Sequence, residues 1–391
     1  MQITRILCLL ILLFSACKPK PQSPLALSVQ YLWSQQSEDG GWHSPVHGIM
    51  KSGQAHTPFV MFALLQIPDS VYTPSEGQVK KGLDFIRASV NDLGAIGFHQ
   101  PYVVEYPNYA TAYALRVLSQ FGNEGDKDLI QKMQNYLINQ QFVERRGIDS
   151  SHYAYGSWGF GEKGIPKGYT GHIDISHTRK VVQALAESGL EEKAVFEKAQ
   201  YFLRLVQKHP DEKRPQPVPG NTSPVFPEAS YPYDGGFYSS PLILGANKAK
   251  YNPESGVFPS YATATCDGML ALLAAGWSVS SEPVIRANQW LKGHKNLNFP
   301  EGIPEDDPDQ WHRVLVIYHL WVRSEVYQKL NWPEEEKKKL LNMILSLQNS
   351  DGSFANQEGS RNKEDDPLLA TAMAVMGMNN LGLGCNNTSS K

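Results

Sequence analysis

The sequence predicts an all-α protein in which a ring of six inner helices is surrounded by a ring of six outer helices. Six mostly apolar stretches begin near residues 55, 108, 172, 260, 310 and 367. Six amphipathic stretches, more polar and richer in Lys and Glu, alternate with them. The pairs recur loosely, at about sixty residues per pair, and such a period is typical of proteins built from repeated helix pairs.

The inner helices are predicted from apolar residues at helical spacing. Three open with a shared small-residue signature: Asn108-Tyr-Ala-Thr-Ala112, Ser260-Tyr-Ala-Thr-Ala264 and Leu369-Ala-Thr-Ala372. The other three are Ala55–Gln66, His172–Ser188 and Gln310–Tyr327. We interpret the Ala and Thr residues as positions where helix backbones approach each other near the ring axis. Asp366 and Pro367 predict the start of the last inner helix, as its N-cap and first helical residue.

The outer helices are expected at 24–36, 76–89, 126–141, 191–208, 282–293 and 333–348. Several are followed by a Gln and then by Gly, a small residue and an aromatic ring. The copies are Gln35-Gln36…Gly40-Gly-Trp42, Gln140-Gln141…Gly156-Ser-Trp158, Gln207…Gly235-Gly-Phe237 and Gln348…Gly352-Ser-Phe354. Gly supplies a left-handed cap, and we expect the Gln amide to join one helix pair to the next. Near residues 98 and 294 this signature is expected to be lost.

These turns resemble the QW repeats of squalene-hopene cyclases and the related repeats of protein prenyltransferase β-subunits. The resemblance covers nearly all of residues 24–383 and implies an α/α toroid. More narrowly, the chain is similar to exported bacterial prenyltransferase/squalene-oxidase-repeat proteins. The residues that carry this likeness are Gly41–Ser44, Lys51–Gln54, Thr57–Val60, His172–Thr178, Cys266–Met269 and Asp365–Pro367. It implies a fold and leaves the reaction open.

The N-terminus is typical of an exported lipoprotein. Residues 1–16 carry one positive charge at Arg5 and then an apolar run, as a signal peptide does. Leu13–Cys17 resembles a bacterial lipobox, so Cys17 is the expected lipidation site and 17–23 the tether to the membrane. No Asp follows Cys17, so we expect anchoring in the cell envelope at the outer membrane. The alternative is a plain signal peptide with an incidental Cys17.

Composition limits the partners and the covalent framework. The 391 residues include 36 Lys and Arg against 39 Asp and Glu, with no basic stripe, so nucleic acid is not an expected partner. Of the 4 Cys, only Cys266 and Cys385 remain free after removal of the signal peptide and acylation of Cys17. Two cysteines do not make a disulfide framework, and whether they pair stays open. A partner subunit also stays open, because prenyltransferase β-subunits work with an α-subunit.

Residues 209–260 interrupt the repeat and 384–391 form a tail. The interruption holds ten of the 26 prolines and is therefore predicted to be a non-helical insertion. So long an excursion inside a compact domain is usually functional, and we expect it to cover one mouth of the ring.

The strongest candidate site is His172-Ile-Asp174-Ile-Ser-His177-Thr178, at the start of an inner helix. In a toroid these starts converge on a central cavity, where backbone N–H groups also favour anions. Hopene cyclases carry Asp-x-Asp-Asp at a comparable place, and there a neutral carboxylic acid protonates an alkene. If Asp174 is the first Asp of that motif, Ser176 and His177 replace the others, so catalysis is unproven. We keep Asp174, His177 and Asp267 as catalytic candidates. The alternative makes Asp174 or Ser176 a helix cap and His177 a wall residue.

The resemblance to prenyltransferases also raises a zinc site. That family binds zinc through an Asp-x-Cys pair and a later His. Here Cys266 and Asp267 are adjacent and in the opposite order, with His312 on the next inner helix. The spacing does not match, so we expect no metal or cofactor and interpret Cys266 as a small buried apolar residue. Zinc at these three residues is the alternative.

Ligand contacts are expected from aromatic and His side chains near the inner-helix starts: Trp42, His43, Tyr109, Trp158, His172, Tyr261, Trp311 and His312. Aromatic faces stabilise isoprenoid cations, so the main hypothesis is a cavity for an isoprenoid or another apolar ligand. Sugars also stack on aromatic rings and are cleaved by paired carboxylates. The second hypothesis is therefore an exported carbohydrate-active enzyme that uses two of Glu105, Asp174, Asp267 and Asp307. The third is a non-catalytic binding protein.

Overall fold

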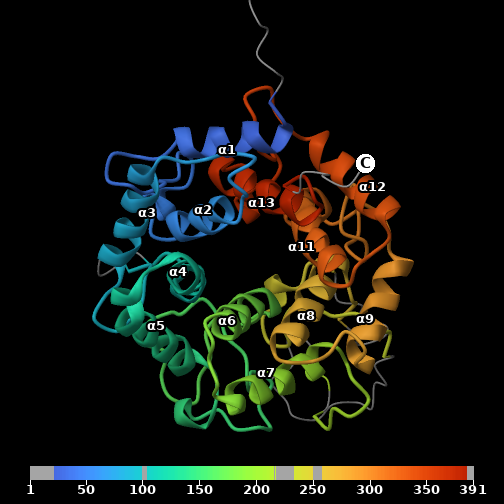
Figure 1. Cartoon of the computed structure of the whole chain (residues 1–391). Helices are drawn as coiled ribbons and strands as arrows, with labels where there is room; N and C mark the ends of the chain where they lie inside the picture. The colour runs from blue at the N-terminus through green and yellow to red at the C-terminus, as the bar shows by residue number, and fades with distance from the viewer. Residues whose placement is uncertain (1–21, 99–103, 215, 217–232, 250–257, 385–391) are drawn as a thin grey trace, which may run out of the picture.

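The chain forms two concentric rings of helices (Figure 1). The computed structural model describes residues 22–98, 104–214, 216, 233–249 and 258–384. These residues contain thirteen α-helices and no β-strand, apart from one isolated bridge between Gly159 and Ile173. The predicted all-α class and the α/α toroid are confirmed.

The inner ring is closed. It consists of α2 (His56–Leu65), α4 (Pro107–Phe121), α6 (Ile175–Glu187), α8 (Ala262–Ala274), α11 (Val316–Lys329) and α13 (Pro367–Asn380). Each of these helices packs against the next, and α13 packs against α2 (Figure 1). Asp366 caps α13 and Pro367 is its first residue, as predicted.

The outer helices lie where amphipathic stretches were expected, with ends shorter by up to three residues. They are α1 (Pro24–Ser34), α3 (Glu76–Ser89), α5 (Lys127–Gln140), α7 (Lys193–Val206), α9 (Glu282–Gly293) and α12 (Glu334–Leu345). Each buries one face against the inner ring and leaves the other toward solvent, because an amphipathic helix gains free energy only from its apolar stripe.

The fifth inner stretch, predicted as one helix, is broken into α10 (Trp311–Val314) and α11. Polar side chains enter the helical hydrogen-bond ladder at the break. The backbone N–H groups of Ile317 and Tyr318 donate to the carboxylate of Glu364, each at 2.9 Å. The Asn356 amide donates to the carbonyl oxygen of Arg313 at 2.8 Å. In a continuous helix these N–H groups and this carbonyl would form backbone hydrogen bonds within the helix. Here they bind side chains of the segment that precedes α13 instead.

Glutamine side chains join successive outer helices. In four places a Gln side-chain amide donates a hydrogen bond to a backbone oxygen of the next outer helix. The pairs are Gln36 with Gln78 at 3.0 Å, Gln141 with Val195 at 3.0 Å, Gln207 with Pro283 at 2.8 Å and Gln348 with Pro24 at 2.8 Å. Each acceptor lies in the first turn of the next outer helix. The bond from Gln348 to Pro24 connects the last outer helix to the first.

The repeated Thr has a function that the sequence interpretation missed. In five inner helices a Thr hydroxyl accepts a hydrogen bond from the backbone N–H of the residue that ends the preceding turn. The pairs are Thr57 with Trp42, Thr111 with Ile96, Thr178 with Trp158, Thr265 with Phe237 and Thr371 with Phe354. The turn near residue 98 keeps this hydrogen bond through Ile96, although the Gln and the aromatic ring of the signature are lost there, as expected. In α8 the bonded residue is Thr265, whereas the shared signature had aligned Thr263.

The turn glycine is required for two reasons, as Gly156 shows. Its φ is 87°, in the left-handed region, and a Cβ there would lie 1.8 Å from the carbonyl oxygen of Lys198 on α7. Any other residue would therefore push the turn away from the next outer helix.

Several predicted segments lie outside the described residues. These are the signal peptide 1–16, Cys17 with most of its tether, and Cys385 in the tail. The described parts of the 209–260 insertion contain one short 3₁₀ turn, Leu244–Ala246, and no α-helix. Among the described residues, no helix combines the length and the apolar composition needed to cross a membrane.

Candidate functional site

A cavity of about 270 Å³ lies at the centre of the ring. All six inner helices, or the residues directly before them, contribute to its wall. The contributing residues include Phe59, Tyr109, Asp174, Asp267, Tyr318, Trp321 and Met373. Ser239, Ala246 and Lys248 of the 209–260 insertion also line it. The inner-helix starts therefore converge on one cavity.

Much of the wall is aromatic. The ring of Phe59 lies 5.8 Å from that of Tyr109 and 5.5 Å from that of Trp321, between ring centres. The rings of Tyr318 and Trp321 are 5.5 Å apart and nearly perpendicular. The two contacts of Trp321 are edge-to-face. Such packing holds the rings in fixed orientations and presents both apolar area and negative ring faces to the cavity.

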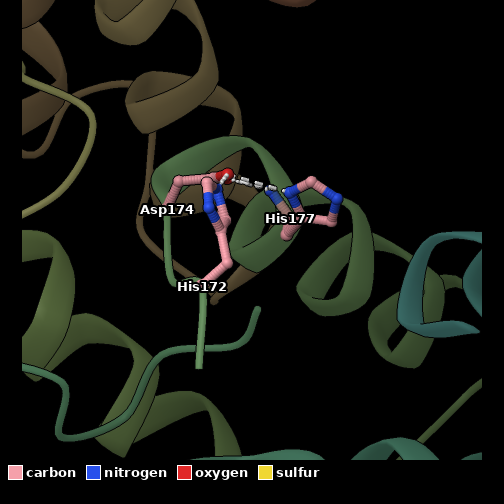
Figure 2. A group of neighbouring side chains, drawn as sticks. All are labelled: His172, Asp174 and His177. Atoms are coloured by element: carbon pink, nitrogen blue, oxygen red, sulfur yellow. Dashed lines mark hydrogen bonds and ion pairs between the residues drawn. The ribbon is translucent and has the colours of Figure 1, made fainter. Parts of the chain in front are cut away.

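The predicted cluster of His172, Asp174 and His177 is brought together at this wall (Figure 2). His172 Nε2 lies 2.7 Å from Asp174 Oδ2, and His177 Nδ1 lies 3.0 Å from the same oxygen. Asp174 Oδ1 accepts the backbone N–H of His177 at 2.7 Å, so Asp174 is the N-cap of α6. Of the two predicted cap candidates it is Asp174, and not Ser176, that caps the helix, and it does so while facing both rings.

Phe160 orients both imidazole rings, and the sequence analysis did not identify it. Its ring stacks on His172 with 3.9 Å between ring centres and 10° between planes, and it meets the His177 ring at 4.7 Å. The backbone N–H of His172 donates to Glu162 at 2.9 Å. The loop after Trp158 therefore sets the geometry of the cluster. Nothing in the sequence marks Phe160 apart from its position near Trp158.

The surroundings of Asp174 favour its carboxylate form. Burial opposes ionisation, but the attraction of His177 and the hydrogen bonds with His172 and His177 outweigh it and hold the pKa of Asp174 well below its usual range. A cyclase acid needs the opposite shift. The geometry therefore favours Asp174 as an acceptor or a metal ligand over a neutral proton donor.

Asp267 is the cavity carboxyl whose pKa is shifted upward, and burial is the main cause. The hydroxyl of Tyr318 donates to it at 2.9 Å, and Arg179 Nε lies 3.0 Å from Oδ1. Lys180 Nζ donates to Ser176 at 2.7 Å and to Tyr318 at 3.2 Å. Burial, with the charge of Arg179, lowers the pKa of Lys180 to about 8. Sequence analysis missed Lys180 and Tyr318, because helical spacing alone does not say which polar residues face the axis.

Half of the expected ligand-contact residues line the cavity: Tyr109, His172, Tyr261 and Trp311. The others lie elsewhere: Trp42, His43, Trp158 and His312. Trp42 and Trp158 are buried between helices, where their indole N–H groups donate to Leu32 and Leu137 oxygens at 2.7 Å. His43 pairs with Asp39 near the surface. Each Trp follows its turn directly, so its side chain packs between the outer and inner helix of a pair and does not reach the cavity.

The suggested zinc residues are not brought together. Among the described residues the His, Cys, Asp and Glu side chains form one group of three with metal-binding geometry, and it contains His172, Asp174 and His177. Burial raises the pKa of Cys266 to about 12, so its thiol stays protonated. His312 faces a separate hollow beside Phe299.

Carboxylates occupy the inner-helix starts, where we had expected N–H groups free for anions. Glu105 accepts from the backbone N–H groups of Ser52 and Ala55 at 3.2 Å, ahead of α2. Asp307 accepts from the N–H of Trp311 at 3.3 Å, ahead of α10. Of the four carboxylates proposed for sugar cleavage, Asp174 and Asp267 line the central cavity, whereas Glu105 and Asp307 act as caps.

The chain matches no protein-family model and no curated protein. Among solved structures it is similar to a variant of the type II terpene cyclase MstE from Scytonema in complex with its substrate, geranylgeranyl dihydroxybenzoate. The TM-score is 0.53 and the identity 13%, covering 91% of this chain and 95% of the cyclase.

It is also similar to an inactive variant of the α-1,6-mannanase GH76A from a Salegentibacter species, in complex with α-1,6-mannotriose. The TM-score is 0.50 and the identity 12%, covering 92% of this chain and 98% of the mannanase. At such identities the likeness concerns the fold alone. The chain therefore has the α/α toroid fold that type II terpene cyclases and GH76 mannanases share.

Proposed function

We propose that the central cavity binds an apolar or amphipathic ligand of isoprenoid type, in a protein anchored to the bacterial cell envelope through a lipid on Cys17. The observation that carries the proposal is the aromatic wall of a cavity enclosed by all six inner helices. Burying an apolar ligand there removes its surface from water, and the ring faces favour positive charge that develops on it.

The size and the charges of the cavity narrow the ligand class. A volume of about 270 Å³ lies just below the range of typical ligand pockets, about 300–1,000 Å³, and this favours a short isoprenoid. Lys248, Arg361 and Lys363 line the same cavity. Lys248 Nζ lies 3.5 Å from the centre of the Trp311 ring, and burial lowers its pKa to about 8. These cations suit a polar or anionic end on the ligand.

No reaction is proposed for Asp174, because the low pKa of its carboxyl opposes the proton donation of a class II cyclase. Asp267 is the better acid candidate, since burial raises its pKa. The ligand-binding proposal does not depend on either role.

A thermal-shift experiment tests the binding. Protein lacking residues 1–17 is melted with geraniol, farnesol or farnesyl diphosphate, and in parallel with α-1,6-mannotriose. A ligand that binds only the folded state raises the melting temperature. Ala264 lines the cavity, so Ala264→Phe should abolish the isoprenoid shift. The matched control is Ala88→Phe on the exposed face of α3, which should keep it. No shift with any isoprenoid, or a shift that survives Ala264→Phe, contradicts the proposal.

A carbohydrate ligand is the second candidate, and the joint presence of Asp174 and Asp267 in one cavity favours it. Two carboxylates across a cavity can share the acid and base roles of glycoside cleavage. Stabilisation by mannotriose alone, lost in Asp267→Asn, would replace the isoprenoid proposal with this one.

A further inference from the structure

We propose that His172, Asp174 and His177 form a binding site for a divalent transition metal, with zinc as the first candidate. The site stands on side-chain geometry and does not depend on the isoprenoid proposal. It is distinct from the zinc alternative at Cys266, Asp267 and His312.

The three ligand atoms already surround one point. His172 Nε2, Asp174 Oδ2 and His177 Nδ1 lie within 4.8 Å of one another. Both ring nitrogens approach the same oxygen, at 2.7 and 3.0 Å. Bonds of about 2.0–2.2 Å to a tetrahedral zinc place ligand atoms about 3.3 Å apart. Each ring nitrogen therefore has to move away from the carboxylate oxygen by about 0.3–0.6 Å, and the two ring nitrogens, which lie within 4.8 Å of each other, have to take the same spacing.

Both oxygens of Asp174 contact a histidine, and one of them also caps α6. Oδ1 accepts the backbone N–H of His177 at 2.7 Å and caps α6. Oδ2 lies 2.7 Å from His172 Nε2 and 3.0 Å from His177 Nδ1, and the same Nδ1 lies 3.0 Å from Oδ1. Oδ1 can therefore keep its bond to the helix N–H while Oδ2 takes up a metal. Because the cap fixes the carboxylate on the first turn of a helix, little conformational entropy is lost when the metal binds.

The histidines are oriented in advance as well. Phe160 stacks on the His172 ring and contacts the edge of the His177 ring, so both imidazoles keep their direction without the metal. Outer-shell contacts that orient metal ligands strengthen binding, commonly by 10- to 100-fold.

The open side of the site faces the ligand cavity, because all three residues line it. Three protein ligands with a fourth position toward a cavity are typical of catalytic zinc, which activates a bound water or polarises an oxygen. Two His and one carboxylate also form the ligand set of non-haem iron sites. We therefore infer a site for metal-assisted chemistry or for metal-mediated ligand binding.

Direct metal binding tests the inference. Protein without a His tag and lacking residues 1–17 is stripped with a chelator, dialysed, and titrated with Zn²⁺ by calorimetry at pH 7.5. We expect one Zn²⁺ per chain, bound at micromolar Kd or tighter. Co²⁺ should give the visible absorption of a tetrahedral site.

Matched variants locate the metal. His172→Phe keeps a ring against Phe160, and Asp174→Asn keeps a good helix cap, so neither is designed to unfold the protein. Each, and His177→Gln, should weaken Zn²⁺ binding at least tenfold while a cooperative melt is retained. His47→Gln removes a different His–carboxylate pair, at 2.7 Å from Asp365, and should leave affinity unchanged. The inference is overturned by absent stoichiometric binding, by binding that survives these substitutions, or by an equal loss in His47→Gln.

Discussion

The side-chain amide of Gln348 donates a hydrogen bond at 2.8 Å to the backbone carbonyl of Pro24, the first residue of α1. The same amide donates to the Ser28 hydroxyl at 2.7 Å. Both partners lie more than 300 residues away in the chain, so this glutamine connects the last outer helix to the first. Gln36, Gln141 and Gln207 join three other pairs of successive outer helices in the same way, and the contact of Gln348 is the one that connects the end of the chain to its start.

Replacing Gln348 by Leu should lower the free energy of unfolding by about 1–3 kcal/mol, because the carbonyl of Pro24 loses its partner in a partly buried place. Urea unfolding followed by circular dichroism measures it. Gln328 on α11 is exposed, and Gln328→Leu should change stability by less than about 0.5 kcal/mol. Equal effects of the two substitutions would show that the ring closure does not depend on Gln348.

The two threonines of α8 should respond differently to the same substitution. Thr265→Val leaves the buried backbone N–H of Phe237 without an acceptor, and we expect a loss of about 1–3 kcal/mol. Thr263 lines the cavity and makes no such bond, so Thr263→Val should cost less than about 1 kcal/mol. Chemical denaturation of both variants decides the assignment. If Thr263→Val lowers the free energy of unfolding more than Thr265→Val does, Thr263 is the repeat threonine of α8, as the sequence signature indicated.

The stability of the chain should depend on pH through Glu364. Burial raises the pKa of this carboxyl to about 7, from 4.5. The unfolded chain therefore releases this proton first, and the stabilisation present below pH 4.5 is lost as the pH rises through 7. Glu364→Gln removes the titration. Its single side-chain oxygen can accept from only one of the N–H groups of Ile317 and Tyr318, so the variant also carries a loss of stability that does not vary with pH. Relative to wild type, the variant should gain on the order of 3 kcal/mol between pH 4.5 and 7.5.

The pH dependence is measured by urea unfolding of both proteins at half-unit steps of pH. Glu191→Gln, at an exposed position, serves as the control and should give a difference that hardly varies with pH. A constant difference between wild type and Glu364→Gln would mean that Glu364 is ionised in the folded protein throughout this range.

Cys17→Ser should release the protein from the membrane, because an acyl chain on the sulfur supplies the attachment. Fractionation of cells that express the full chain measures this, together with incorporation of a labelled fatty acid. Cys266→Ser is the control, since Cys266 is buried in the toroid. Label incorporation that persists in Cys17→Ser would leave the residue as an incidental part of a plain signal peptide.

Much of the fold could be predicted because most helices are determined by the residues within them. The alternation of apolar and amphipathic stretches located twelve helices, since each depends on residues within its own turns. The break before α11 could not be found in this way. It depends on Glu364 and Asn356, which lie about forty residues further along the chain and enter the helix from outside.

The candidate site was predicted in part for a similar reason. The segment from His172 to His177 carries several polar groups close together in sequence, and the structure brings them to the cavity wall. Trp42 and Trp158 were expected there too, but residue type alone does not distinguish a wall residue from a spacer buried between helices. Phe160 and Tyr318 were missed because their direction toward the axis depends on the rotation of each loop or helix.

The carboxylates at the inner-helix starts determine which charges a ligand meets. At the start of four inner helices a carboxyl group accepts a hydrogen bond from a backbone N–H. The carboxyl groups are Glu105 at α2, Asp174 at α6, Glu364 at α11 and Asp366 at α13. The N–H groups at the starts of these four helices are thus already bound by the chain's own carboxyl groups. In the proposed ligand site, recognition of an anionic group would then depend on cavity cations such as Lys180 and Lys248, whose charge can be removed by mutation or by alkaline pH. The groups that stabilise the helix starts are thus different from the groups that would choose the ligand. Substitution of one cavity lysine should therefore change which ligand is bound without weakening the helices.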